Sequence, residues 1–178
     1  DDPQCGVHQD GREDIEDGDL EIHRPVTGVT ADAKQAKVAI RHVPDRPGVA
    51  AQLFGALAEK AISVDMIIQS VQENLTNDIA FTVHEDDLNQ AIAITQQVAD
   101  QLGARDVVYD QDVAKVSIVG VGMIGTPGIA AEMFEALSNA SINIQMISTS
   151  EIKISCVVAR SGVKQAMQVI HNHFVLPE

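Results

Sequence analysis

The residues best suited to bind a small molecule lie in the loop Pro44-Asp45-Arg46-Pro47-Gly48, which precedes a helix-forming stretch. Free N–H groups and positive potential at a helix N-terminus suit a carboxylate. Gly48 lets the backbone approach a ligand closely, and Asp45 suits an ammonium group. Together these features favour the zwitterion of an amino acid. An ordinary strand-to-helix turn is the other interpretation that the residues leave open.

Two further patterns give weaker evidence for a functional site. Gly120-Val-Gly-Met-Ile-Gly125 matches GxGxxG, but no βαβ unit with a distal acid follows, so nucleotide binding is not predicted. Ser148-Thr-Ser-Glu151 offers a nucleophile beside an acid, yet the sequence places no base, and we interpret it as the polar end of a strand that could face a ligand. His8 and His23 lie among acidic residues without a metal-ligand spacing. We therefore predict no catalytic residue, no cofactor and no metal.

The candidate loop belongs to a stretch that the chain contains twice, beginning at Lys37 and at Lys115. In each copy an alternating apolar run predicts a strand, a loop with Gly and Pro follows, and a helix is predicted from the proline. Thr126 is the predicted N-cap of the second helix. Such a long internal match predicts tandem units. The shared residues after the loops are Pro47/Pro127, Gly48/Gly128, Ala50/Ala130, Ala51/Ala131, Phe54/Phe134, Ala56/Ala136, Leu57/Leu137, Ile62/Ile142 and Met66/Met146.

Both copies predict a ferredoxin-like β-α-β-β-α-β unit. The first has a strand to His42, a helix Pro47–Lys60, strands Val64–Val71 and Ile79–Val83, a helix Asp87–Leu102 and a strand Val107–Tyr109. The second has a strand Val116–Val121, a helix Pro127–Asn139, strands Ile144–Ser148 and Ile154–Val158, and a helix Val163–Phe174. Its fourth strand is missing.

The short strand Val26–Thr30 can fill that gap, because an open sheet edge is a liability. The first unit would then be inserted within the second. The predicted fold class is α+β, with two tandem ferredoxin-like domains and antiparallel sheets. We assign residues 1–25 to an acidic flexible segment or linker, 26–34 to the strand given to the second domain, 35–112 to the first domain and 113–178 to the second.

Composition narrows the class of protein. The formal net charge of −14 argues against nucleic acid as a partner. No apolar stretch is long enough to span a membrane, and no signal peptide is apparent. Cys5 and Cys156 are isolated, and Cys156 lies in an apolar strand that predicts a buried thiol. These features predict a reducing, cytoplasmic location.

The pattern Asp45-Arg-Pro-Gly48, followed by Ile62-Ser-Val-Asp-Met-Ile67, resembles ACT domains, the small-molecule regulatory modules of amino-acid metabolism. From Val26 to Phe174 the chain resembles the regulatory region of bacterial aspartate kinase, most specifically at Ile142–Ser155. The resemblance implies paired ACT domains that bind threonine and lysine and inhibit a kinase. The kinase domain's Lys-Phe-Gly-Gly motif is absent from this sequence. We therefore expect a small regulatory subunit, or a regulatory fragment, that does not phosphorylate aspartate alone.

The resemblance also implies two effector sites. The first would use Asp45, Gly48, Val49, Ala50 and Gln69, with Asn143 and Ile144 supplied by the partner in a homodimer. The second would use Met123, Gly125, Thr126, Gly128, Ile129, Ala130, Ser150 and Glu151. Gln145 stands where some lysine-inhibited members carry Asp, so threonine at the first site is better supported than lysine at the second. A ligand-free dimerisation module is the alternative.

Overall fold

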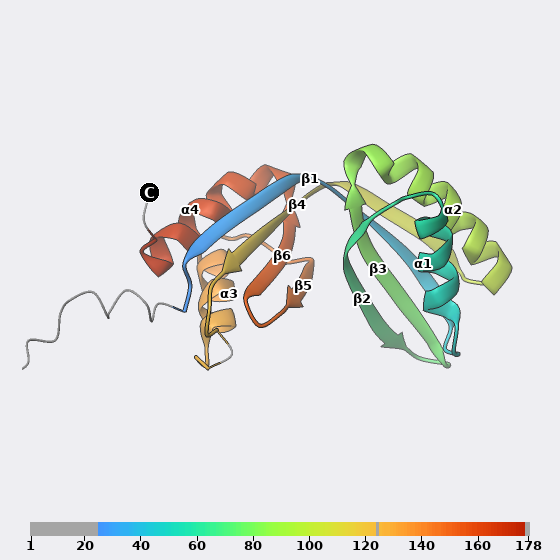
Figure 1. Cartoon of the computed structure of the whole chain (residues 1–178), viewed down its shortest axis with the longest axis horizontal. Coiled ribbons are helices and arrows are strands. Elements are labelled where there is room, and N and C mark those ends of the chain that lie inside the picture. Colours follow the sequence, from blue (N-terminus) through green and yellow to red (C-terminus); the bar gives the residue numbers. More distant parts are fainter. Residues whose placement is uncertain (1–24, 124, 177–178) are drawn as a thin grey trace, which may run out of the picture.

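The structure is a computed structural model that describes residues 25–123 and 125–176 (Figure 1). These residues form one six-stranded antiparallel sheet, in the order β2-β3-β1-β4-β6-β5, and four α-helices. The strands are β1 (Gly28–Pro44), β2 (Val64–Gln72), β3 (Thr76–His84), β4 (Asp106–Val119), β5 (Met146–Thr149) and β6 (Lys153–Ala159). The helices are α1 (Val49–Glu59), α2 (Leu88–Leu102), α3 (Ile129–Asn139) and α4 (Val163–Phe174), with short 3-10 turns η2 (Glu85–Asp87) and η3 (Arg160–Gly162).

Strands β1 and β4 run through both halves of the molecule (Figure 1). The sequence predicted two separate short strands along each of them, and this is wrong: each is one long strand. The register between them shifts on both sides of Gln35, near the middle of β1. Bulges bend and twist a strand without ending its pairing. The polar residues at the bend interrupt the alternating pattern that predicts a strand, but they are part of the sheet.

Each half has the same strand order once the long strands are divided. The first half contains β2, β3, the later part of β1 and the earlier part of β4. The second half contains β5, β6, the later part of β4 and the earlier part of β1, with Gly28 opposite Val119 and Val29 opposite Ile118. The α+β fold class is confirmed, with the first ferredoxin-like unit inserted in the second.

The helices of each half cover one face of its part of the sheet and enclose a separate apolar core (Figure 1). In the first half Leu53 and Leu57 of α1 and Phe81 of β3 are fully buried in the core. In the second half Met133 of α3 and Ile170 of α4 are fully buried in the other core. Both cores are almost entirely aliphatic.

A third cluster joins the two halves. It contains Met66 of β2, Met146 of β5, Val113 of β4 and Val157 of β6, all buried. Met66 and Met146 are equivalent in the two repeats. The sheet surfaces that the helices leave uncovered therefore approach each other at this point.

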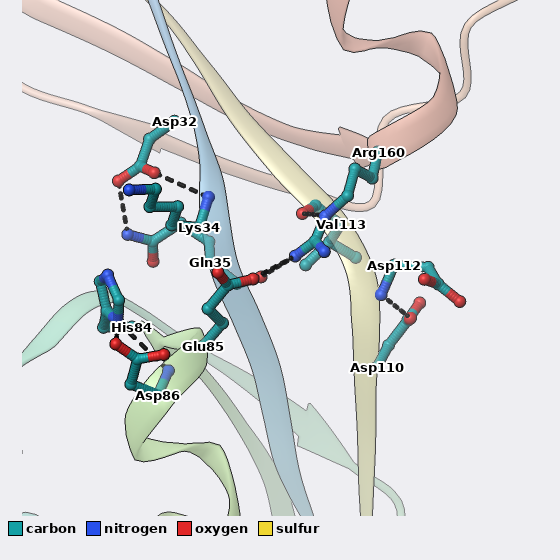
Figure 2. Close-up of polar contacts among 10 residues, drawn as sticks. All are labelled: Asp32, Lys34, Gln35, His84, Glu85, Asp86, Asp110, Asp112, Val113 and Arg160. Atoms are coloured by element: carbon teal, nitrogen blue, oxygen red, sulfur yellow. Dashed lines mark hydrogen bonds and ion pairs between the residues drawn. The ribbon is translucent and has the colours of Figure 1, made fainter.

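Polar contacts hold the bend between the halves (Figure 2). The guanidinium of Arg160 donates to the backbone oxygens of Gln35 and Val113, at 3.2 and 3.4 Å, and to the carboxylate of Glu85 at 3.2 Å. Arg160 belongs to η3 of the second half and Glu85 to η2 of the first. One side chain thus ties both long strands and both halves together.

The helices α1 and α3 begin two residues later than predicted, after Gly48 and Gly128 rather than at the prolines. Both glycines are left-handed N-caps, with φ of 93° and 89°, a conformation that glycine adopts without steric cost. Thr126 is therefore not the N-cap, and its hydroxyl donates to the backbone oxygen of Gly122 at 3.3 Å. The turn is therefore a glycine cap, whereas the sequence analysis placed the helix start at the proline.

Cys156 of β6 is fully buried, as predicted, and burial raises the pKa of its thiol to about 12. The thiolate that reactive cysteines require is therefore disfavoured. Within the described residues, no helix has the length and apolar character needed to cross a lipid bilayer.

Candidate effector site

The loop before α1 is fastened to the turn between β2 and β3. The Asp45 backbone N–H donates to the Leu75 carbonyl oxygen at 2.9 Å, and Asp45 Oδ1 accepts a hydrogen bond from Asn77 Nδ2 at 3.0 Å. Before the loop, His42 takes a left-handed conformation, with φ of 54°, where the β1–β3 register shifts. Its N–H donates to Asp78 Oδ1 at 2.8 Å. The Asp45 carboxylate is thus held in position by the sheet beside it.

Asn77 is a site residue that the sequence analysis missed. Asn77 is only 4% exposed, and among the described residues its Oδ1 atom has no hydrogen-bond partner. The amide N–H₂ must face the Asp45 carboxylate, because the amide oxygen would be repelled by it, so the acceptor oxygen is left over. Leaving a buried polar atom unpaired costs about 1–3 kcal/mol. The atom is also closed off from solvent, so a ligand that donates a hydrogen bond here recovers that cost only when the neighbouring side chains move to admit it.

A signal for Asn77 exists in the sequence. It is the polar member of the alternating run Asn77, Ile79, Phe81 and Val83, whose members are all buried. A polar side chain on the buried face of a strand needs a partner. The predicted strand begins at Ile79, so Asn77 falls outside it.

The start of α1 completes the arrangement. Gly48 is exposed, and no side chain caps this helix, so Asp45 is not its cap. Ala50 is exposed in the first turn, whereas the Val49 side chain is buried in the core. Val49 can therefore contribute only its backbone to a ligand. Among the N–H groups of the first turn, those before Gln52 have no carbonyl partner within the helix.

Gln69 of β2 is exposed and lies on the same sheet face as Asn77. Gln69 is opposite Ile79, and Val71 is opposite Asn77. Residues opposite each other, and residues two apart on one strand, point to the same face, so all four side chains share one face of the sheet. The structure therefore brings Asp45, Asn77 and the start of α1 together, with Gln69 on the neighbouring edge strand.

Asn143 and Ile144 lie elsewhere. They line an open hollow with Phe134, Ser138, Ser141 and Ile142, all in the second half of the chain. No residue of the first half lines this hollow. The prediction that these two residues form the other wall of the first site, from a partner chain, stays a prediction.

The second predicted site has the same helix start with different surroundings. Gly125, Thr126, Gly128, Ser150 and Glu151 are exposed. Of the others, Met123 and Ile129 are buried in the second core, and Ala130 is half-buried beside it. Counting back from Pro47 and Pro127 makes Gly125 the equivalent of Asp45. The sheet registers, continued by one residue, make Ile152 the equivalent of Asn77. This site therefore lacks the acceptor pair of the first.

The GxGxxG match and the serine-rich segment have structural explanations. A Cβ atom on Gly120 would lie 1.8 Å from the Pro25 carbonyl oxygen, so glycine is required where the chain passes Pro25. Ser150 donates through its N–H to the Lys153 carbonyl oxygen at 2.8 Å, and its hydroxyl lies 3.5 Å from the same atom. These contacts explain Ser150 as part of the turn between β5 and β6.

Equivalent residues of the two repeats also form the polar contacts across the molecule. Lys37 donates to Gln145 Oε1 at 2.8 Å, and Lys115 forms an ion pair with Asp65. Lys37 is equivalent to Lys115, and Asp65 to Gln145. Thus the ion pair of Lys115 with Asp65 on one side corresponds, on the other side, to a hydrogen bond from Lys37 to a neutral amide.

A further ion pair belongs to the first half alone. Arg41 donates to Asp106 at 2.6 and 2.5 Å across β1 and β4. These hydrogen bonds hold the pKa of Asp106 below its usual range and raise the pKa of Arg41. Their equivalents in the second half, Val119 and Gly28, cannot form such a pair.

Comparisons with known proteins place these features in a family. Residues 38–103 and 116–174 each match the ACT domain. An aspartokinase of Pseudomonas aeruginosa is 45% identical over 163 residues, which are 91% of this chain and 40% of that protein. An aspartokinase of Thermus thermophilus is 40% identical over 159 residues, 88% of this chain and 39% of the relative. The chain thus spans about two-fifths of the length of these relatives.

Two solved structures match over almost their whole length. The crystal structure of aspartokinase alpha and beta subunits superposes with a TM-score of 0.79 at 45% identity, covering 85% of this chain and 99% of that one. The ligand-free regulatory subunit of aspartate kinase from Thermus thermophilus gives 0.80 at 41% identity, covering 84% and 99%.

Proposed function

This chain belongs to the ACT-domain family as a regulatory region of aspartokinase, and on that premise we propose that it binds end-product amino acids for feedback inhibition. Threonine is the proposed ligand of the first site, and lysine the candidate second effector. The observation that carries the proposal is the pair of acceptors, Asp45 and the unpartnered oxygen of Asn77, beside the open start of α1.

The chemistry of an α-amino acid fits both ends of this arrangement. Its ammonium group has three donors, which suit the Asp45 carboxylate and Asn77 Oδ1. Its carboxylate suits the free N–H groups after Gly48. Hydrogen bonds to charged groups contribute about 1.5–3 kcal/mol each, which is enough for effector-level affinity from a few contacts.

Side-chain preference is set by the surroundings of these groups. The small, exposed Ala50 leaves space beside the helix start. Gln69 offers an amide that can pair with a ligand hydroxyl. A short hydroxylated side chain such as that of threonine suits this combination. We propose that Asn143 and Ile144 of a partner chain close the site.

A homodimer supplies that partner. The edge strands of the sheet, β2 and β5, have unpaired backbone groups. Ile67 on β2 and Ile147 on β5, equivalent in the repeats, are 52% and 42% exposed. Pairing β2 of one chain near β5 of another would cover both. Light scattering with and without threonine tests this, and a monomer in both conditions would rule it out.

The regulatory consequence follows from linkage. An effector that binds one arrangement of the domains more tightly shifts the population towards it, by no more than its differential affinity. We propose that a catalytic domain or subunit of aspartate kinase senses this shift, in the cytoplasm.

Titration calorimetry with the common amino acids tests the proposal directly. We expect saturable threonine binding, and inhibition when the chain is combined with an aspartate kinase catalytic domain. If no amino acid binds to a dimeric chain, the ligand-free dimerisation module is the better description. Activity with aspartate and ATP by this chain alone would contradict a purely regulatory role.

A further inference from the structure

A small polar pocket of about 150 Å³ lies where the two halves approach each other. The second half supplies Lys115, Lys153, Ser148, Thr149, Ser150 and Ser155 to its lining, and the first half supplies Asp65 and Met66. At about 30 Å³ per water molecule, the volume accommodates several waters or one small ligand. It is lined by two ammonium groups, one carboxylate and several hydroxyls.

The strand registers explain why these groups converge. Ser148 on β5 is opposite Ser155 on β6, and Ser155 is opposite Ser117 on β4. The three hydroxyls therefore share the sheet face that the helices leave uncovered. Ser155 is 5% exposed and is hydrogen-bonded to Ser117 at 2.7 Å. The base of the pocket is thus fixed by a buried pair of serines.

The two lysines of the pocket differ in the partners that they already have. Lys115 has a side chain only 12% exposed and is paired with Asp65. An ammonium group has three donors, so this pairing leaves others available. Lys153 is half-buried, and within the described residues no ion pair engages its ammonium group. The pocket therefore has an excess positive charge in a chain whose net charge is −14.

The repeat supplies an internal comparison. The equivalents of Ser148, Ser155 and Lys153 in the first half are Ile68, Ala80 and Asp78. The fold therefore tolerates apolar and acidic residues at these positions. Packing alone does not account for hydroxyls and a cation at all three positions in one half.

We propose that this pocket binds a small tetrahedral oxyanion of the phosphate class. Its oxygens would accept hydrogen bonds from Lys153, Lys115 and the serine hydroxyls. Charge-assisted hydrogen bonds of this kind are among the strongest in proteins. Because the anion competes with Asp65 for Lys115, its binding affects a contact between the two halves. This proposal does not depend on the identity of the amino-acid effector.

Inorganic phosphate is the probe. We expect saturable binding by calorimetry at constant ionic strength, with chloride as the balancing anion. Lys153→Gln should weaken it about tenfold, the loss of one charge-assisted contact. Lys164→Gln, at an exposed lysine on α4, is the matched control and should bind like the parent. No saturable binding, or equal affinity in parent and Lys153→Gln, would overturn the proposal.

Other ligands show which class of anion binds, and a second variant gives a test that does not depend on the stability of Lys153→Gln. A phosphomonoester that binds as well as phosphate would point to a phosphorylated metabolite, while a preference for free phosphate would favour the ion itself. Equal binding of acetate, or complete displacement of phosphate by threonine or lysine, would instead make the pocket part of an effector site and overturn the proposal. Ser148→Ala, which removes only one hydroxyl, should also weaken binding and provides the test if Lys153→Gln melts earlier than the parent in chloride.

Discussion

The loops before α1 and α3 end in the same glycine cap but have different side chains. Both end in a left-handed glycine, with φ of 93° and 89°, and both open an uncapped helix. Around α1, Asp45 and the buried Asn77 offer acceptors. The aligned residues near α3 are Gly125 and Ile152, and Ile152 is 59% exposed. A helix N-terminus alone thus specifies only an attraction for anions. The side chains around it decide whether an amino-acid zwitterion is recognised.

The largest effect is expected from removing the charge that distinguishes the first loop. Asp45→Asn should reduce threonine affinity by about 10- to 150-fold, because a charge-assisted hydrogen bond of about 1.5–3 kcal/mol is lost. Ser150→Ala should cost less, since that hydroxyl is neutral. Glu151→Gln should affect mainly a second effector.

Calorimetry and thermal melts on these variants separate binding from stability. No side chain caps α1, so Asp45→Asn should change the melting temperature little. A variant that binds threonine like the parent would mean that the first site is wrongly assigned.

Steric change at the helix start should have the next largest effect. Ala50→Phe is expected to weaken threonine binding about tenfold, since the ring would fill the space beside the ligand. Ala50 is exposed, so the fold should survive. The matched control is Ala130→Phe at the equivalent position of α3, which should leave threonine binding at the first site intact. Equal loss in both variants would indicate a general structural effect.

Exchanging the asparagine between the repeats sharpens the comparison further. Asn77→Ile should weaken threonine binding about tenfold, because a hydrogen bond from the charged ammonium group of the ligand, worth about 1.5–3 kcal/mol, is lost. The reciprocal double variant, Gly125→Asp with Ile152→Asn, should create measurable amino-acid affinity at the second loop. A Cβ atom on Gly125 would meet only an ordinary contact at 3.7 Å. Competition between threonine and a labelled amino acid in an Asp45→Asn background would show whether the graft binds.

The smallest effect concerns the contacts between the halves. Asp65→Gln gives Lys115 a neutral acceptor, as Gln145 is for Lys37. Asp65 is 40% exposed, so the unfolding free energy should fall by less than about 1 kcal/mol. The salt dependence of stability should decrease as well. Urea unfolding at low and high salt measures both, and a loss well above this range would mean that the ion pair is more strongly desolvated than its exposure indicates.

Much of the fold could be predicted because the repeat showed which residues occupy equivalent places. The helix α4 has its predicted bounds, and α2 begins one residue after its predicted start. The long strands could not be predicted, since bulges around Gln35 interrupt the alternation while the pairing continues. Strand β5 begins at Met146, later than predicted, because apolar residues ahead of a strand have the same pattern as the strand itself.

The candidate site was predicted in part for a related reason. Asp45 and Gly48 are adjacent in sequence, and their types point to a ligand without any tertiary information. Asn77 reaches the same place through the sheet, across the pairing of β1 with β3. Contacts between distant segments depend on register, which a single sequence specifies weakly in a polar turn. An unpartnered oxygen is visible only when all neighbours are placed.

The sharing of β1 and β4 between the halves sets an order in which the molecule can fold. The residues around Gly28 emerge from the ribosome long before their partners around Val119, whereas the first half lies entirely between them. Closing a long loop carries an entropic cost that grows with its length. Once the first half has folded, Gln35 and Val113 are already side by side, and the remaining strands can pair outward from that point. We expect the first half to act as a template for the second, so that slowing its folding delays the whole chain.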